Sequence, residues 1–370
     1  MLFILRLFTA LNVLACISLA ADNKDEGQDV KVSMWDRTTN LRGAFGYKDN
    51  ILLSNSNPEQ SAFWQTGLDF SLLRIADSGS TISLFFSGED RRYFSAESIN
   101  KEQLFLTQAK FSWEIGQNWE AGLPVNYSYI DEVFDASATE QILEPQPVIS
   151  HRFSVSPYVS YKLPWESTLE LKFYGDRQLL NDPLDDYWEY GPQLTWRKTY
   201  GYRSEVSLSY TYRLRPYDTK GFVTFDFEEI PGTSLIFRQH EFEFVLNHSW
   251  DEPRRWRTRT RLAYTRNEEN GTGYYEYNRY RLAQRAGYYG TTWQVVVEGK
   301  VLNYDYLRQP VADSGDIRNW WEYILGLRVE KNLLPKLKLF LETEHEWVDS
   351  NNPIEEYHVN TVMSGIDWEF

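Results

Sequence analysis

The feature that most constrains this chain is a period-two alternation of apolar and polar side chains, which recurs from residue 41 to the end. Near residue 207, for example, Val206 and Leu208 alternate with Ser207 and Ser209. Successive residues of a strand point to opposite faces of a sheet. The alternation therefore predicts strands that each have one apolar and one polar face.

Marking these segments predicts about sixteen strands, of ten to sixteen residues each. They cover residues 41–54, 62–75, 80–93, 103–115, 119–130, 150–163, 167–176, 187–198, 202–215, 238–250, 255–266, 275–288, 291–306, 317–330, 336–347 and 356–370. Strands of soluble sheets average about five or six residues. These segments are long enough to cross the apolar layer of a membrane as tilted strands, which takes about 9–11 residues.

The connections between the predicted strands are alternately short and long. Turns such as Gly116–Asn118 and Thr199–Gly201 are short, whereas Asp131–Ile149 and Pro216–Phe237 are long polar loops. A strand meander with short turns at one rim and long loops at the other is typical of membrane barrels. The predicted fold class is thus all-β, a transmembrane antiparallel up-and-down β-barrel. Closure is required because an unpaired strand edge costs several kcal/mol in hydrocarbon.

Composition excludes the main alternatives. The mean hydropathy of −0.53 is too low for a bundle of transmembrane helices, each of which needs about 20 mostly apolar residues. The 25 Tyr, 21 Phe and 14 Trp exclude a disordered chain. The single cysteine excludes a disulfide framework. A propeller would show a repeat of about 40–45 residues, and we see none.

The first residues read as an export signal. Met1–Ala20 has one charge, Arg6, then an apolar stretch and a small-residue cleavage pattern ending at Ala20. A lipoprotein signal with Cys16 acylated is the alternative. We expect residues 21–40 to form a periplasmic, flexible N-terminal lead, and residues 41–370 to form the barrel.

The last strand carries the sharpest motif. Val362, Ile366, Trp368 and Phe370 share one face, and the chain ends on the aromatic ring. With the signal and the alternation, this resembles a Gram-negative outer-membrane β-barrel of the porin type. The resemblance implies outer-membrane localisation with a periplasmic C-terminus and contacts with outer-membrane lipid and lipopolysaccharide. It also implies that the barrel-insertion machinery reads Trp368 and Phe370 as the membrane insertion signal.

In a barrel the polar strand faces line the lumen, and sixteen strands leave room for water there. Strand parity predicts a ladder of lumenal arginines on neighbouring strands, with few carboxylates near them. Its members are Arg203, Arg213, Arg215, Arg255, Arg257, Arg259, Arg261, Arg279, Arg281 and Arg285. The ladder either guides anionic solutes as a substrate-binding track or braces the wall by pairing with Glu205, Glu241 and Glu243.

The last strands predict a second, acidic wall inside the barrel. It consists of Glu342, Glu344 and Glu346, which share the inward parity. A basic wall opposite an acidic wall sets up a transverse field that orients polar solutes. Lumenal Tyr174, Tyr277 and Trp320 could stack on sugar rings or simply fill space.

On the outer face, tryptophans near strand ends predict an aromatic belt: Trp196, Trp250, Trp256, Trp293, Trp347 and Trp368.

Nothing in the sequence points to an enzyme, a metal site, a cofactor or a nucleic-acid partner. Four of the five histidines, His240, His248, His345 and His358, fall on the lipid-facing parity. Neither a Gly-x-Ser-x-Gly elbow nor a His-Glu-x-x-His helix is present. Gln284 and Ser364 are polar but also fall on the lipid-facing side of their strands. Either the strand parity is wrong there, or these residues lie in a subunit interface such as that of a homotrimer.

The sequence therefore predicts an outer-membrane channel for passive diffusion of small polar or anionic solutes, with acidic oligosaccharides as one such class. The alternative is a polysaccharide export or envelope-assembly barrel that acts with periplasmic partners. Loop Pro216–Phe237 carries Phe222, Phe225, Phe227 and Ile230, which are apolar enough to fold inward as a constriction or to meet a neighbouring subunit.

Overall fold

The computed structural model describes residues 35–75, 79–134, 145–226, 228–311 and 314–370. The predicted export signal, including Cys16, and most of the predicted N-terminal lead lie outside these residues, as does Phe227. The described chain contains no helix that could cross a bilayer.

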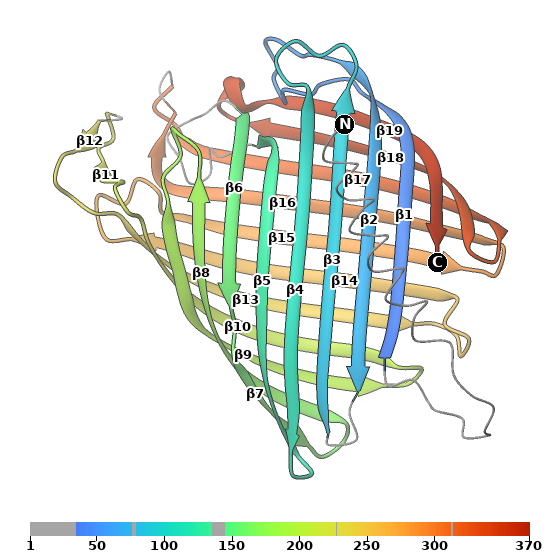
Figure 1. Ribbon diagram of the computed structural model, residues 1–370. Coiled ribbons are helices and arrows are strands. Elements are labelled where there is room, and N and C mark those ends of the chain that lie inside the picture. The colour runs from blue at the N-terminus through green and yellow to red at the C-terminus, as the bar shows by residue number, and fades with distance from the viewer. Residues whose placement is uncertain (1–34, 76–78, 135–144, 227, 312–313) are drawn as a thin grey trace, which may run out of the picture. The chain divides into compact units, whose positions relative to one another are not determined.

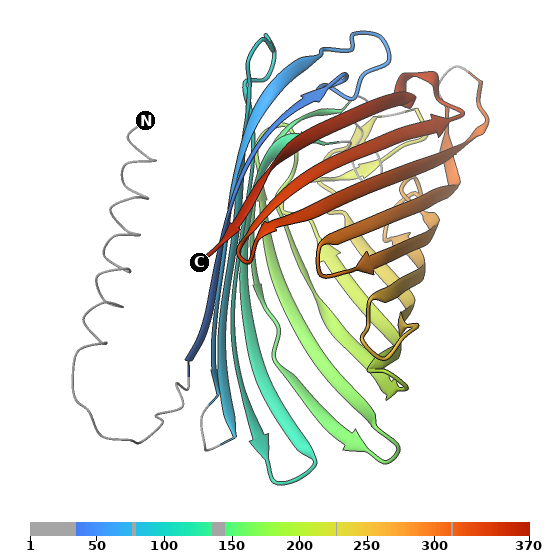
Figure 2. The same ribbon diagram turned by 90° about the vertical axis from the view of Figure 1, so that its right-hand side faces the viewer.

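The described residues form a closed antiparallel barrel (Figures 1 and 2). Its strands are β1 (Trp35–Lys48), β2 (Ser61–Ile75), β3 (Ser80–Tyr93), β4 (Lys101–Ile115), β5 (Trp119–Phe134), β6 (Gln146–Val155), β7 (Tyr158–Leu163), β8 (Ser167–Leu180), β9 (Tyr187–Tyr200), β10 (Ser204–Pro216), β13 (Ile236–Ser249), β14 (Trp256–Glu269), β15 (Tyr277–Tyr289), β16 (Trp293–Pro310), β17 (Ile317–Leu334), β18 (Leu337–Ser350) and β19 (Tyr357–Glu369). Wall strands that follow one another in the chain pair with each other, except β6 and β7, which both pair with β5 and β8. The strands β1 and β19 pair to close the wall.

Two of these segments are halves of one wall strand. Both β6 and β7 lie between β5 and β8, and the break between them falls at Ser156 and Pro157. Proline has no N–H to donate to a ladder, which explains the interruption. Counting β6 and β7 together gives the sixteen strands that the sequence predicts.

The first strand lies earlier than predicted. It begins at Trp35 rather than residue 41 and ends at Lys48 rather than residue 54. Trp35–Asn40 pair with the end of β2, so part of the predicted flexible lead belongs to the wall. The strand ends where the Asn50 amide donates hydrogen bonds to the carbonyl oxygens of Ser54 and His358 and turns the chain.

Burial in this barrel is inverted relative to a soluble protein. On the outer face Leu208, Phe242 and Leu262 are 45–55% exposed. On the inner face of the same strands, polar Thr211 and Thr265 are almost completely buried. Apolar side chains displayed around a closed wall require a hydrocarbon surrounding. The chain is therefore a membrane-spanning barrel, as the alternation predicts.

The two rims differ as predicted. At one rim the connections have two to six residues, and at the other they have six to nineteen. The C-terminus lies at the short-turn rim, where the Phe370 N–H donates to the Thr39 carbonyl oxygen at 2.9 Å. The long-loop rim carries a 3-10 turn, η1 (Pro353–Glu355), and a small hairpin of β11 (Phe222–Val223) and β12 (Glu229–Ile230).

The two walls of the barrel run in different directions. Strands β2–β5 are steep in Figure 1, and the strands of the wall behind them, such as β15–β17, cross them at a large angle. Strong tilt is required to close a sheet of this size. It also brings side chains of sequence-distant strands to face one another across the lumen.

Candidate functional site

The lumen holds a cavity of about 740 Å³ between its middle and the long-loop rim. Basic side chains reach it from β1, β3, β10, β15 and β16, and acidic side chains reach it from β4, β5, β17 and β18. The charged residues that line it are Lys48, Arg91, Glu102, Glu132, Arg215, Arg279, Arg281, Lys300, Glu322, Glu342, Glu344 and Glu346. The structure thus brings the central arginines of the predicted ladder and the predicted acidic wall to one cavity.

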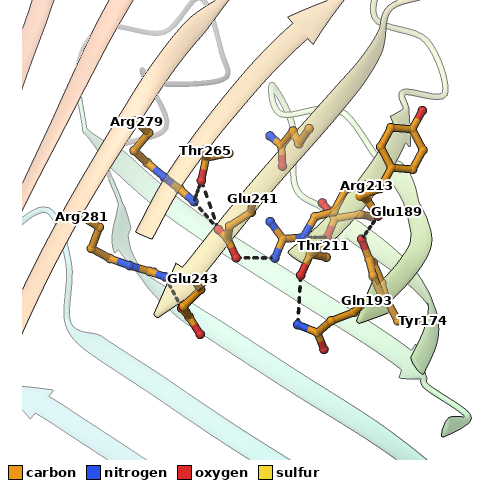
Figure 3. A network of polar contacts seen from close by, with 12 residues as sticks. Tyr174, Glu189, Gln193, Thr211, Arg213, Glu241, Glu243, Thr265, Arg279 and Arg281 are labelled. Atoms are coloured by element: carbon orange, nitrogen blue, oxygen red, sulfur yellow. Dashed lines mark hydrogen bonds and ion pairs between the residues drawn. The ribbon is translucent and has the colours of Figure 1, made fainter. Parts of the chain in front are cut away.

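The basic wall is held by carboxylates that bridge arginines of different strands (Figure 3). Glu241 on β13 accepts hydrogen bonds from Arg213 on β10 and Arg279 on β15, both at 3.1 Å. Glu243 accepts one from Arg281 at 2.9 Å and another from Arg261. The alternating charges form a brace across four neighbouring strands.

A further carboxylate, Glu189 on β9, extends this brace and was not singled out from the sequence. Its oxygens lie 2.7 Å from Arg215, 3.7 Å from Arg213 and 3.8 Å from Arg152. Arg152 also pairs with Asp176 on β8. The inward parity of Glu189 and Asp176 is the signal that could have found them.

The expectation that most ladder arginines lack a nearby carboxylate is therefore wrong for this inner group. Direct cross-strand neighbours do not account for the pairs, because Arg213 lies opposite Gln239 and Arg279 lies opposite Thr265. Long side chains instead reach diagonal partners one or two strands away. Each shared carboxylate offsets the repulsion between the two arginines it joins.

The acidic wall lies across the cavity. Glu342 pairs with Arg328 at 2.5 Å, and Glu346 accepts a hydrogen bond from Tyr357 at 2.7 Å. Glu322 pairs with Lys300 at 2.5 Å. Among the described residues, no lysine or arginine nitrogen lies within 4.0 Å of Glu344. Glu344 and Glu346 thus form no ion pair within the described residues, whereas Glu342 and Glu322 do.

A second group of ladder arginines lies at the short-turn rim. Arg203 and Arg255 lie in turns rather than in strands, while Arg257, Arg259 and Arg285 lie on the inner faces of β14 and β15. All five are exposed. In the described part of the chain, the only carboxylate oxygen within 4.0 Å of their guanidinium nitrogens belongs to Glu298, at 3.9 Å from Arg285. The ladder is thus divided into a neutralised centre and an uncompensated end.

Buried aromatic residues fill the lumen at the long-loop end. Tyr277, Tyr304 and Trp320 pack together, with ring centroids 5.1 Å apart for the two tyrosines and 4.9 Å apart for Tyr304 and Trp320. Leu53 from the loop after β1 joins them. Tyr277 is 2% exposed, so it fills space and is not open for a sugar ring to stack on. Tyr174, the third candidate, donates to the carbonyl oxygen of Tyr212.

The outer face carries the predicted aromatic belt. Trp250, Trp256, Trp293 and Trp368 are each about half exposed near the short-turn rim. The lipid-facing histidines join it: His240 bonds the Tyr210 hydroxyl at 2.8 Å, and His248 stacks on Tyr200. The other side chains that the sequence predicts on the outer face also point outward by strand register. They are Trp196, Trp347, His345, His358, Gln284 and Ser364.

Loop Pro216–Phe237 packs on its neighbour at the long-loop rim. Val223 and Leu235 are buried against Tyr274 and Tyr275 of the loop that follows β14. Asp218, outside the spanning strands, accepts two hydrogen bonds from Arg177, which lower the pKa of its carboxyl. Within the described residues, no three His, Cys, Asp or Glu side chains are grouped to hold a metal ion.

No family model and no curated relative matches the chain. Among solved structures it is similar to OccAB1 of Acinetobacter baumannii, at 8% identity and a TM-score of 0.48, covering 94% of this chain and 100% of that one. It is also similar to OccK9 (OpdG) of Pseudomonas aeruginosa, at 9% identity and a TM-score of 0.48, covering 91% and 98%. The outer-membrane protein OpdK of Pseudomonas aeruginosa follows at 9% identity and 0.45, covering 90% and 99%.

Proposed function

We propose that this chain is an outer-membrane channel for passive diffusion of small polar or anionic solutes. The observation that carries the proposal is the charged cavity of about 740 Å³ inside a closed barrel whose outer face is apolar. A cavity lined by so many charged groups holds water, and a sixteen-stranded wall is wide enough to enclose an aqueous path.

The two walls of the cavity supply selectivity by orientation. Arg279 and Arg281 lie on one side, and Glu344 and Glu346 lie on the other. A solute with a dipole, or with charges at both ends, aligns in the field between them, whereas a bulky apolar solute gains nothing there. Because Glu241 and Glu243 offset the central arginines, the centre admits polar solutes and does not select strongly for one sign of charge.

The same geometry supports an orientation in the envelope. Short turns of bacterial barrels face the periplasm and long loops face outward, which places the C-terminus in the periplasm. We infer that Met1–Ala20 directs export and that Trp368 and Phe370, whose rings lie 5.4 Å apart at the short-turn rim, are read during insertion. Outer-membrane lipid and lipopolysaccharide then cover the apolar outer face, and Gln284 is a candidate contact of a homotrimer.

Planar-bilayer conductance tests the channel directly. We expect purified protein to produce discrete current steps. In a salt gradient, the reversal potential should shift in the direction of greater cation selectivity when Arg257, Arg259 and Arg261 are all replaced by Ser. The replacement removes three lumenal positive charges and leaves the acidic wall intact. The triple replacement of Leu208, Phe242 and Leu262 by Val on the outer face is the control, and should leave the reversal potential unchanged.

Two results would contradict the proposal. Correctly folded protein that inserts into the bilayer and carries no current is not a diffusion channel. A current whose reversal potential is the same with and without the three arginines would contradict the part of the proposal in which these side chains act on permeating ions.

A further inference from the structure

The uncompensated arginines form a pocket of their own. It has a volume of about 430 Å³, lies at the short-turn end of the barrel and is separate from the central cavity. Its charged lining residues are Arg203, Arg254, Arg257, Arg259, Arg285 and Glu205. Five arginines against one glutamate leave an excess of four positive charges.

Two of these arginines, Arg257 and Arg254, are held by contacts with groups other than carboxylates. The Arg257 Nε atom donates to the Arg254 carbonyl oxygen at 2.6 Å, and its guanidinium lies over the Tyr289 ring at 4.5 Å from the centroid. Arg254 donates to the Ser249 hydroxyl at 3.3 Å. In the described part of the chain, none of Arg203, Arg254, Arg257 and Arg259 lies within 4.0 Å of an acidic oxygen.

The single glutamate does little to offset this charge. Glu205 lies 3.8 Å from Arg197, which is outside the pocket lining. Arg259 and Arg285 lie directly opposite each other on β14 and β15. Like charges directly opposite on a sheet are destabilising. In the centre of the lumen Glu241 and Glu243 remove such a cost, and at the rim no described side chain does so for Arg259.

We propose that this rim pocket binds an oligoanion, a chain that carries carboxylate or phosphate groups at repeating intervals. Guanidinium groups fork onto both kinds of oxyanion and are weakly hydrated. Arg257 and Arg259 are two residues apart on one face, about 7 Å along the strand, so they contact successive anionic groups. Because both are on the inner face, the ligand is a soluble chain that enters the lumen and not a lipid headgroup on the outer wall.

This inference rests on the proposed function, which supplies the class of solute. The new element is the place at which an anionic solute first binds. An anionic chain on the periplasmic side meets the exposed positive rim before it reaches the neutralised centre. Screening limits electrostatic attraction to about 8 Å at physiological salt, so the pocket acts at contact range and its affinity should fall as salt rises.

Isothermal titration of the detergent-solubilised full barrel tests the proposal without requiring an open pore. Two probes separate the sources of anionic charge: tripolyphosphate and a trisaccharide of uronic acids, with an uncharged trisaccharide as control. We expect at least one anionic probe to bind and its affinity to fall at least tenfold in R257S/R259S. R266S is the matched control, since Arg266 lies on β14 outside the pocket and pairs with Glu268 at 3.4 Å; there we expect less than a threefold change.

Equal binding of an anionic probe to wild type and R257S/R259S would overturn the rim site, as would absence of binding by both anionic probes. Equal binding of the uncharged trisaccharide would show that charge is not what the pocket recognises. Circular dichroism and heat-modifiable gel mobility establish that the variant barrel is folded. Current without oligoanion binding would contradict this inference alone, and binding without current would contradict the channel alone.

Discussion

Lumenal arginines fall into two groups that differ in what their guanidinium groups contact. Arg213 and Arg279 share the carboxylate of Glu241, while Arg257 and Arg259 contact no described carboxylate. Residue type and strand parity are identical in the two groups, so the alternation predicts the lumenal face of all four. It cannot predict their partners, because pairing depends on register and on diagonal reach between strands.

Replacing Glu241 by Gln should destabilise the barrel. Its side chain is 9% exposed and offsets two arginines, so the substitution leaves two partly buried cations facing each other. We expect the free energy of unfolding to fall by about 1–3 kcal/mol, as for loss of a buried charged partner. Urea unfolding in lipid vesicles measures the loss.

Glu298→Gln is the control for Glu241→Gln. Glu298 also faces an arginine, but at 3.9 Å and with both side chains about half exposed. Pairs of this kind contribute about 0–1 kcal/mol. If the two substitutions destabilise the barrel equally, the carboxylate of Glu241 is not a brace.

Asp218 should titrate below the ordinary range of an aspartate. Arg177 donates to both of its oxygens, at 2.8 and 2.5 Å, and these hydrogen bonds lower the pKa of the carboxyl. A lowered pKa in the folded state stabilises the loop above the unfolded value of about 3.9, and the contribution is lost as pH falls through the folded pKa. Carboxyl carbon-13 shifts should show a midpoint below 3.9 that moves upward in Arg177→Gln, and an unchanged midpoint would contradict the contact.

At the scale of elements, the sequence is most informative about strands and least informative about their ends. Alternation predicts the extent of β3, Ser80–Tyr93, without error. Alternation does not predict the bounds of β1 correctly. The pairing of Trp35–Asn40 with β2 is a non-local contact, and the turn after Lys48 depends on Asn50. The buried cluster of Tyr277, Tyr304 and Trp320 also involves a residue of a distant loop, Leu53, which periodicity does not connect to it.

Closure between β1 and β19 depends on close approach at Gly365. A Cβ atom there would lie 2.2 Å from the Gly43 carbonyl oxygen and 2.7 Å from the Ala44 Cα atom, both on β1. Backbone atoms cannot move aside as a flexible side chain can, so we expect Gly365→Ala to cost about 1–3 kcal/mol through overpacking. The midpoint of heat-modifiable gel mobility should fall accordingly.

Gly299 on β16 provides the matched control for Gly365. It also lies within a wall strand, but no atom lies within 4 Å of its ideal Cβ position. Gly299→Ala should leave the mobility midpoint within error of wild type. A Gly365→Ala barrel that is as heat-stable as Gly299→Ala would show that the β1–β19 seam is looser than described.

For the whole molecule, the central claim is that neighbouring residues of one strand face different media, lipid outside and water inside. Leu282 is outward and 45% exposed on the barrel surface, and Ala283 is inward on the same strand. Because Cys16 is the only cysteine of the chain and lies in the predicted export signal, single-cysteine variants report on one position each.

The most direct test is labelling of Leu282→Cys and Ala283→Cys in lipid vesicles with a charged, membrane-impermeant maleimide. The account predicts rapid labelling at position 283, protection at position 282, and equal labelling of both after unfolding in detergent and urea. Labelling at position 282 with protection at position 283, or equal labelling of both in folded vesicle-embedded protein, would contradict it.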